Sequence, residues 1–197
     1  PNNRVYLELN ETLERDERTD LNLPPLEYAQ LKPFSGSEAL MLNFTSGRDI
    51  RKHTVRRILE EFRGMKYIDL HSLTLGIDRN RHRFQRQIPD WKDYVSGADF
   101  LQLTSAESRS LSDEPAAAEP AEIGRTAARE VRKACLMTSG GEGVTVFTAE
   151  GERRFPAVPV EKAADTTGCG DIFGAAFLVN HLQSGSIPVA AGAAVKA

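Results

Sequence analysis

The chain has 197 residues with a formal net charge of −3, enough for one domain with a real core. It has no basic excess to attract nucleic acid or an anionic membrane, no apolar run of membrane-spanning length and no signal-peptide pattern. Its two cysteines, Cys135 and Cys169, exclude a disulfide framework and a cysteine-rich zinc site, and the four histidines lack metal-ligand spacing. We expect a cytoplasmic protein with no nucleic-acid or membrane partner.

The beginning of the chain predicts a strand and then a charged return. Residues 4–10 alternate, with Val5, Leu7 and Leu9 on one face, which is typical of a strand with one covered and one wetter face. Residues 11–20 are highly charged and are expected to form a loop or the return of a hairpin.

A strand–helix–strand unit follows. The apolar run 39–44 predicts a buried strand, residues 49–63 a helix with one apolar stripe, and residues 66–71 the next strand. This spacing favours a right-handed βαβ unit in a parallel sheet. Asp69 and His71 fall at the carboxyl end of their strand, where open α/β sheets bind ligands. Capping and loop hydrogen bonds explain the two residues equally well.

The middle of the chain continues this alternation. The strongly basic residues 78–86 predict an exposed loop, and residues 98–103 a third strand. Thr104-x-x-Glu107 follows that strand directly, and from the residues alone a plain helix capping box is the favoured interpretation. Residues 120–134 carry apolar side chains along one side and predict a helix.

A glycine-rich turn separates the next two predicted strands. Residues 135–138 predict a fourth strand and residues 144–148 an antiparallel return. Between them, Thr138-x-Gly140-x-x-Gly143 allows bare backbone to lie against a ligand. A hairpin turn that requires positive φ explains the same glycines.

The stretch from Asp165 to Asp171 reads Asp-Thr-Thr-Gly-Cys-Gly-Asp and precedes an apolar, small-residue helix pattern. A helix N-terminus offers free N–H groups and a positive dipole end, and glycines let a phosphate approach them. Asp171 is placed to take a proton from a hydroxyl that attacks such a phosphate. An ordinary helix entry capped by Asp165 or Thr166 is the alternative, and the spacing alone leaves both open.

Other phosphate-binding mechanisms find little support in this sequence. The Walker pattern G-x-x-x-x-G-K-[ST] and the protein-kinase signatures are absent. Gly168-x-Gly170 resembles a relaxed dinucleotide fingerprint, but neither a strongly apolar strand before it nor an acid about twenty residues after it is present.

Three motifs in order resemble those of the ribokinase-like (PfkB) carbohydrate kinase family. Residues 165–178 are similar to its C-terminal signature D-T-x-G-A-G-D with small and apolar residues after it, and Cys169 replaces the usual Ala. Thr138-x-Gly140-x-x-Gly143 resembles the nucleotide-binding T-x-G-x-x-G of the family. Thr104-x-x-Glu107 resembles its N-x-x-E, with Thr in place of Asn. Residues 1–25 resemble part of the family's β lid.

The resemblance implies an α/β, ribokinase-like fold, with a mostly parallel central sheet flanked by helices and part of a small β lid. It implies one kinase domain over residues 1–197, which we expect to be part of a longer protein because the chain starts without Met and ends inside a helical pattern. It also implies ATP and Mg²⁺ as cofactors and a sugar substrate. Because the strand at residues 4–10 would offer an exposed sheet edge, we also expect a homodimer through the lid. Asp171 is then the general base, Gly168, Cys169 and Gly170 form the anion hole, the nucleotide is bound by Thr138, Gly140, Gly143, Asp165 and Thr166, and Glu107 organises Mg²⁺ through water.

The expected function is therefore ATP-dependent phosphotransfer to a hydroxyl group of a sugar or related polyol. Two alternatives stay open: a nucleoside kinase, and a non-catalytic remnant that binds a nucleotide or a partner protein. The remnant hypothesis rests on Thr104, which lacks the amide of Asn, and on the family's N-terminal sugar-binding elements, which have no counterpart in these residues. The resemblance does not imply that the 197 residues are active by themselves.

Overall fold

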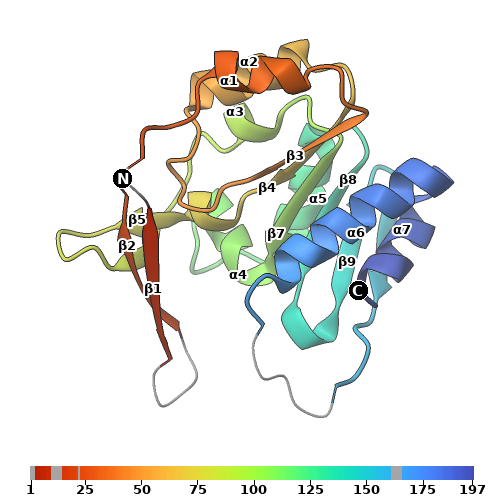
Figure 1. The fold of residues 1–197 in the computed structure, drawn as a ribbon. Coiled ribbons are helices and arrows are strands. Elements are labelled where there is room, and N and C mark those ends of the chain that lie inside the picture. The colour runs from red at the N-terminus through yellow and green to blue at the C-terminus, as the bar shows by residue number, and fades with distance from the viewer. Residues whose placement is uncertain (1–2, 10–14, 22, 161–165) are drawn as a thin grey trace.

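A computed structural model describes residues 3–9, 15–21, 23–160 and 166–197. Its centre is a six-stranded sheet in the order β10-β9-β8-β7-β4-β3 (Figure 1). The pairs β3–β4, β4–β7 and β7–β8 are parallel, whereas β9 and β10 run antiparallel. The strands of this sheet are β3 (Ala39–Asn43), β4 (Met65–Asp69), β7 (Phe100–Thr104), β8 (Ala134–Thr138), β9 (Val144–Thr148) and β10 (Gly151–Phe155).

Helices cover both faces of this sheet, as expected when parallel strands are joined by helical crossovers. The α-helices are α1 (Tyr28–Leu31), α2 (Lys52–Glu61), α3 (Lys92–Val95), α4 (Ser105–Ser108), α5 (Pro120–Glu130), α6 (Cys169–Ser184) and α7 (Ile187–Ala194). Short 3₁₀ turns occupy η1 (Lys32–Phe34), η2 (His71–Thr74), η3 (Arg109–Leu111) and η4 (Gly140–Glu142). The predicted βαβ unit is confirmed in β3, α2 and β4, although α2 is shorter than the predicted 49–63.

Two hydrophobic cores follow from the alternation of side chains along the strands. Ile68, Leu101 and Met137 point to the face that α2 and α5 cover. Their neighbours Tyr67 and Phe100 point to the opposite face, which α6 and α7 cover. Residues of odd number in β3 and β4, and of even number in β7, therefore face α6.

The segment predicted as a basic loop is partly a hairpin. Strand β6 (Arg83–Gln85) pairs with β5 (Leu75–Ile77), so the loop prediction for 78–86 is wrong at its end. The turn is built by Asp78, whose Oδ1 accepts from the backbone N–H groups of Asn80 and His82, each at 2.8 Å. A short strand with no apolar alternation leaves no periodic pattern from which to predict it.

Strands β1 (Arg4–Leu9) and β2 (Arg15–Asp20) form the predicted N-terminal hairpin, which extends away from the central sheet (Figure 1). A backbone hydrogen bond of 3.0 Å from Thr19 N to Arg81 O joins it to the β5–β6 hairpin. Val5 and Leu7 are 46% and 45% exposed. The expectation of one covered face is therefore wrong for β1, because the two-stranded sheet has no layer packed on that side among the described residues. Its role as a lid stays a prediction.

Within the described residues, no helix is long and apolar enough to span a membrane.

Candidate active site

The carboxyl ends of the parallel strands meet at one edge of the sheet, and α6 begins at the same edge. The strand register places Asn43 beside Asp69, and Asp69 beside Gln102, on three adjacent strands. All three side chains point to the face covered by α6, because they share the alternation of Tyr67 and Phe100. The sheet therefore presents a row of three polar side chains to the first turns of α6.

The entry of α6 is a tight turn built around Gly168. Gly168 precedes the helix with a φ of +81°, a left-handed conformation that favours glycine. Cys169 N donates to Thr166 O at 3.2 Å, and Ile172 N donates to Gly168 O at 2.9 Å. The first-turn N–H groups of a 16-residue helix then lie at the edge where the strands end. Asp165 lies outside the described residues.

Asp171 lies in this first turn with an exposed side chain. The side-chain amide of Asn43 donates to Asp171 Oδ1, which connects the end of β3 to α6. An exposed carboxylate held by one amide keeps its other oxygen available for a further proton or hydrogen bond. The predicted base and the three predicted anion-hole residues are thus brought together in one turn.

Gln102 links β4, β7 and α6 through buried hydrogen bonds. Its Nε2 donates to Asp69 Oδ2 at 2.9 Å and to Gly170 O at 3.1 Å. The Tyr67 hydroxyl donates to Gln102 Oε1. The prediction from sequence did not include Asn43, Gln102 or Tyr67 in the site. The available sign was a polar residue inside or at the end of an otherwise apolar strand.

A cluster of titratable groups lies beside this row. Asp69 is 4% exposed, and burial first, then the nearby charges of Glu107 and Asp171, raise its pKa to about 7, while His71 opposes the rise. The pKa of His71 is raised from its ordinary value, chiefly by its interaction with the Glu107 carboxylate. His71 Nδ1 lies 3.6 Å from Glu107 Oε1. His71 begins η2 with a φ of +30°, so the predicted strand ends before it.

The capping interpretation of Thr104-x-x-Glu107 is confirmed. Glu107 N donates to Thr104 Oγ1 at 3.1 Å, and Thr104 N donates to Glu107 Oε2 at 2.7 Å, so both halves of a capping box are present. One carboxylate oxygen of Glu107 is committed to the box, and the other faces His71. The role of Glu107 toward Mg²⁺ stays a prediction.

The residues present fit a magnesium ion held together with substrate phosphates. Among the described residues, no group of three or more His, Cys, Asp or Glu side chains is placed to hold a metal. Mg²⁺ commonly keeps several waters and uses only one or two carboxylates together with phosphate oxygens. Glu107 and Asp69 supply carboxylates of that kind at the strand ends.

A hollow of about 490 Å³ lies next to the ends of β7 and β8. The Ser105 and Ser139 hydroxyls meet at 2.5 Å on its wall. Its lining residues are Thr104, Ser105, Ala106, Thr138, Ser139, Gly140 and Glu142. The volume falls within the range of small-molecule sites. Two of the three predicted nucleotide residues of the T-x-G-x-x-G motif therefore line an open space.

The two glycines of that motif have different roles. Gly143 has a φ of +97°, and a Cβ there would overlap Phe155 O and lie 2.6 Å from Ala157 N, so close approach of the neighbouring backbone requires glycine. Gly140 has a φ of +52°, but nothing lies within 4 Å of the place of its Cβ. The hairpin alternative thus accounts for the positive φ of both glycines, and Gly140 also borders the open hollow.

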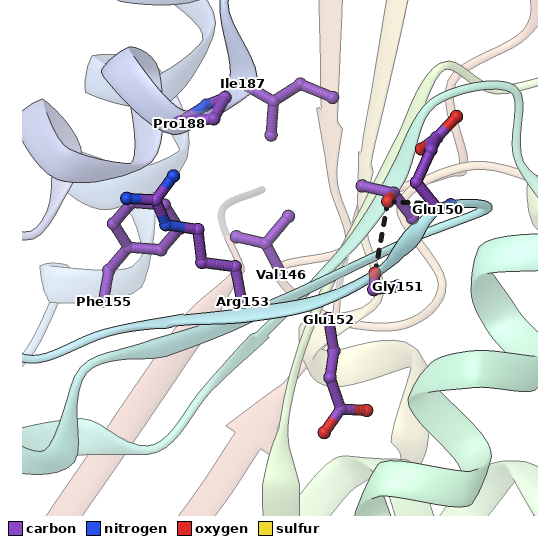
Figure 2. A pocket seen from close by; sticks show the side chains of 9 residues that line it. Val146, Glu150, Gly151, Glu152, Arg153, Phe155, Ile187 and Pro188 are labelled. Atoms are coloured by element: carbon purple, nitrogen blue, oxygen red, sulfur yellow. Dashed lines mark hydrogen bonds between the residues drawn. The ribbon is translucent and has the colours of Figure 1, made fainter.

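A second hollow, of about 360 Å³, lies at the opposite edge of the sheet (Figure 2). It is enclosed by the β9–β10 hairpin and the start of α7, and the Arg153 guanidinium lies 5.1 Å from the centre of the Phe155 ring. None of the predicted site residues lines it. The candidate active site is therefore the strand-end edge that carries α6.

The family model described as "pfkB family carbohydrate kinase" matches residues 76–197. The match covers more than half of the chain and includes all three motifs. The chain belongs to the pfkB family. The family predicted from the motifs is thereby confirmed. No curated protein matches the sequence.

Solved structures of similar fold confirm the ribokinase-like α/β architecture. A pyrophosphate-dependent kinase in the ribokinase family, complexed with a pyrophosphate analog and myo-inositol, is 20% identical with a TM-score of 0.78, over 97% of this chain and 66% of that one. Arabidopsis thaliana ribokinase complexed with ribose and ATP is 16% identical with a TM-score of 0.74, over 99% and 61%. Adenosine kinase from Sinorhizobium meliloti is 18% identical with a TM-score of 0.73, over 98% and 58%. The chain thus spans roughly three fifths of the length of these proteins.

Proposed function

We propose that this chain carries the phosphate-donor side and the catalytic base of an ATP-dependent kinase that phosphorylates a hydroxyl group of a sugar or related polyol. The observation that carries the proposal is the turn at the start of α6. There Asp171 lies beside the Gly168–Gly170 backbone, at the same edge as the hollow that Thr138 and Gly140 line. This arrangement supports phosphoryl transfer because that reaction depends on positioning and charge stabilisation.

In the proposed step, an acceptor hydroxyl attacks the terminal phosphorus of the donor, and Asp171 accepts the hydroxyl proton. A new O–P bond forms, the bond from that phosphorus to the bridging oxygen breaks, and ADP leaves with the bridging oxygen. The N–H groups of the α6 entry stabilise the charge that develops on the transferring group. Mg²⁺, if bound together with the donor, would neutralise phosphate charge, and Glu107 and Asp69 are the residues that would supply carboxylates to it.

The test compares Asp171→Asn with wild type in the full-length protein. ATP and pyrophosphate serve as donors, with a panel of sugars, polyols and nucleosides as acceptors. Loss of the base lowers turnover by a factor on the order of 10²–10⁴. Glu150→Gln, which removes an exposed carboxylate at the opposite edge, should leave turnover unchanged. Equal turnover of wild type and Asp171→Asn would remove Asp171 from the role of base.

The same panel separates the alternatives. Transfer confined to nucleosides supports a nucleoside kinase, an activity that the name of the Sinorhizobium relative makes worth including. ATP binding by calorimetry without any transfer supports the non-catalytic remnant, for which Thr104 in place of Asn is the motivating residue. Pairing of two copies through the β1–β2 hairpin also stays a proposal, and gel filtration that shows only monomer would reject it.

A further inference from the structure

Gln102 is a polar side chain in the middle of the central sheet, and the residues before and after it in β7 are apolar. It is 3% exposed, between Leu101 and Leu103, which are fully buried. Burying an amide costs free energy unless its donors and acceptor are all satisfied. Here they are, since Oε1 accepts from Tyr67 and Nε2 donates to both Asp69 and Gly170.

The orientation of this amide follows from its partners. Gly170 O is a carbonyl, which can only accept, and it lies 3.1 Å from Nε2. If the amide were reversed, an oxygen would face that carbonyl. Tyr67 is fully buried, and burial raises the pKa of its hydroxyl, so it stays a phenol and donates to Oε1. The side chain of Gln102 is therefore fixed at both ends of its amide.

Two consecutive turns of α6 rest on the same side chain. In the first turn, Gly170 O accepts the hydrogen bond from Gln102 Nε2. In the second, Gly174 packs so closely that a Cβ there would lie 2.9 Å from Gln102 Oε1 and 2.6 Å from Met41 Cε. The N-terminal end of α6 thus packs directly on β7 at Gln102.

We propose that Gln102 is a positioning residue for phosphotransfer. Through its hydrogen bond to Gly170 O, it fixes the position of the Gly170–Asp171 turn of α6 relative to the carboxyl ends of the strands. This inference rests on the proposed function for its catalytic consequence. Gln102 acts on the backbone of the turn, and its amide is fully occupied by protein partners. A small displacement of this turn moves both the base and the anion-hole N–H groups, and misplacement by about 1 Å can cost about 10² in rate.

The first experiment measures hydrogen exchange of the backbone amides of residues 172–174. Gln102→Met keeps the length and volume of the side chain but removes both donors. Exchange at these amides should become roughly three- to ten-fold faster, as expected for the loss of one hydrogen bond. Val55→Ala, on the opposite core, is the matched control, because it lowers global stability without touching α6. An equal increase in the two variants, after correction for global stability, would overturn the proposal.

The second experiment measures kcat and KM for the donor. Gln102→Met should lower kcat by roughly 10- to 100-fold and change KM for the donor by less than about three-fold, because the turn acts on the transferring group. Tyr67→Phe keeps both Nε2 bonds and removes only the partner of Oε1, so its loss in kcat should be smaller. If Gln102→Met does not fold, Gln102→Leu, which also lacks the Nε2 donor, decides in its place: unchanged exchange at residues 172–174 and unchanged kcat in that variant would reject the positioning role.

The two readouts separate this inference from the proposed function. If the wild-type protein transfers no phosphoryl group, the proposed function fails, and the exchange comparison still decides whether Gln102 holds the turn. If the wild type is active and Gln102→Met exchanges and turns over like wild type, only the positioning role fails.

Discussion

Replacing Asp69 with Asn should stabilise the protein at alkaline pH, because the fold buries a carboxyl group that resists ionisation. Burial, then the charges of Glu107 and Asp171, raise the pKa of Asp69 from 3.8 to about 7. The folded state therefore binds this proton more tightly than the unfolded chain. The resulting contribution to stability is present below about pH 4 and is lost as the pH rises through 7.

The magnitude follows from that difference in pKa. One unit of pKa difference between the folded and unfolded states corresponds to about 1.4 kcal/mol. The rise in the pKa of Asp69 from 3.8 to about 7 therefore lowers the free energy of unfolding by ~4 kcal/mol when the carboxyl is fully ionised. Asn has the same shape, can accept the Gln102 hydrogen bond and carries no charge. The free energy of unfolding of Asp69→Asn, relative to that of wild type, should therefore increase by roughly 2–3 kcal/mol between pH 5 and pH 8.

Urea denaturation of wild type and Asp69→Asn at pH 5 and pH 8 measures this difference. The pKa of His71 is also raised, so its contribution is likewise lost as the pH rises, and the variant should retain part of the pH dependence. Glu150→Gln should show the same stability difference from wild type at both pH values. If the difference in unfolding free energy between Asp69→Asn and wild type does not grow with pH, the argument that burial opposes the ionisation of Asp69 is refuted.

Substitutions at Gly174 and Thr104 test the packing of α6 and the capping box. Gly174→Ala should destabilise the protein by about 1–3 kcal/mol in urea denaturation, because the added Cβ would meet Met41 and Gln102. Gly192→Ala in α7 is the control. Nothing lies within 4 Å of its added Cβ, so this variant should be neutral or more stable by up to about 1 kcal/mol. Shifts of the same sign and size would contradict the close packing. Thr104→Ala should cost about 1 kcal/mol by the same assay and Thr104→Asn only a few tenths, because Asn can also cap; equal losses would argue against capping as the role of this residue.

Much of the central fold could be predicted from the sequence because its local and long-range patterns agree. The apolar run 39–44, the helix stripe in α2 and the next strand required the βαβ unit that the structure contains. The β5–β6 hairpin was missed because its pairing is set by the Asp78 turn, not by apolar alternation. The covered face expected for β1 was wrong, since alternation reports a two-faced strand but not whether another layer packs on it.

The site was only partly predictable for a similar reason. The motif around Asp171 identified the helix entry, and the structure brings Gly168 to Asp171 into one turn. Asn43 and Gln102 could not be connected to it, because their meeting depends on the strand register that places them on either side of Asp69. A single sequence gives no direct information about register between strands that are joined by long crossover connections.

The hydrogen bond between Asn43 and Asp171 joins residues 128 positions apart. Parallel strands pair only after long crossovers close, and such contacts form late and slowly in folding. During synthesis, β3, β4 and β7 leave the ribosome well before α6. The polar side chains of Asn43, Asp69 and Gln102 can therefore contact α6 only after the rest of the chain up to that helix has been made. We therefore expect the site to be completed late in the folding of this chain, after the strands that carry Asn43 and Gln102 have paired.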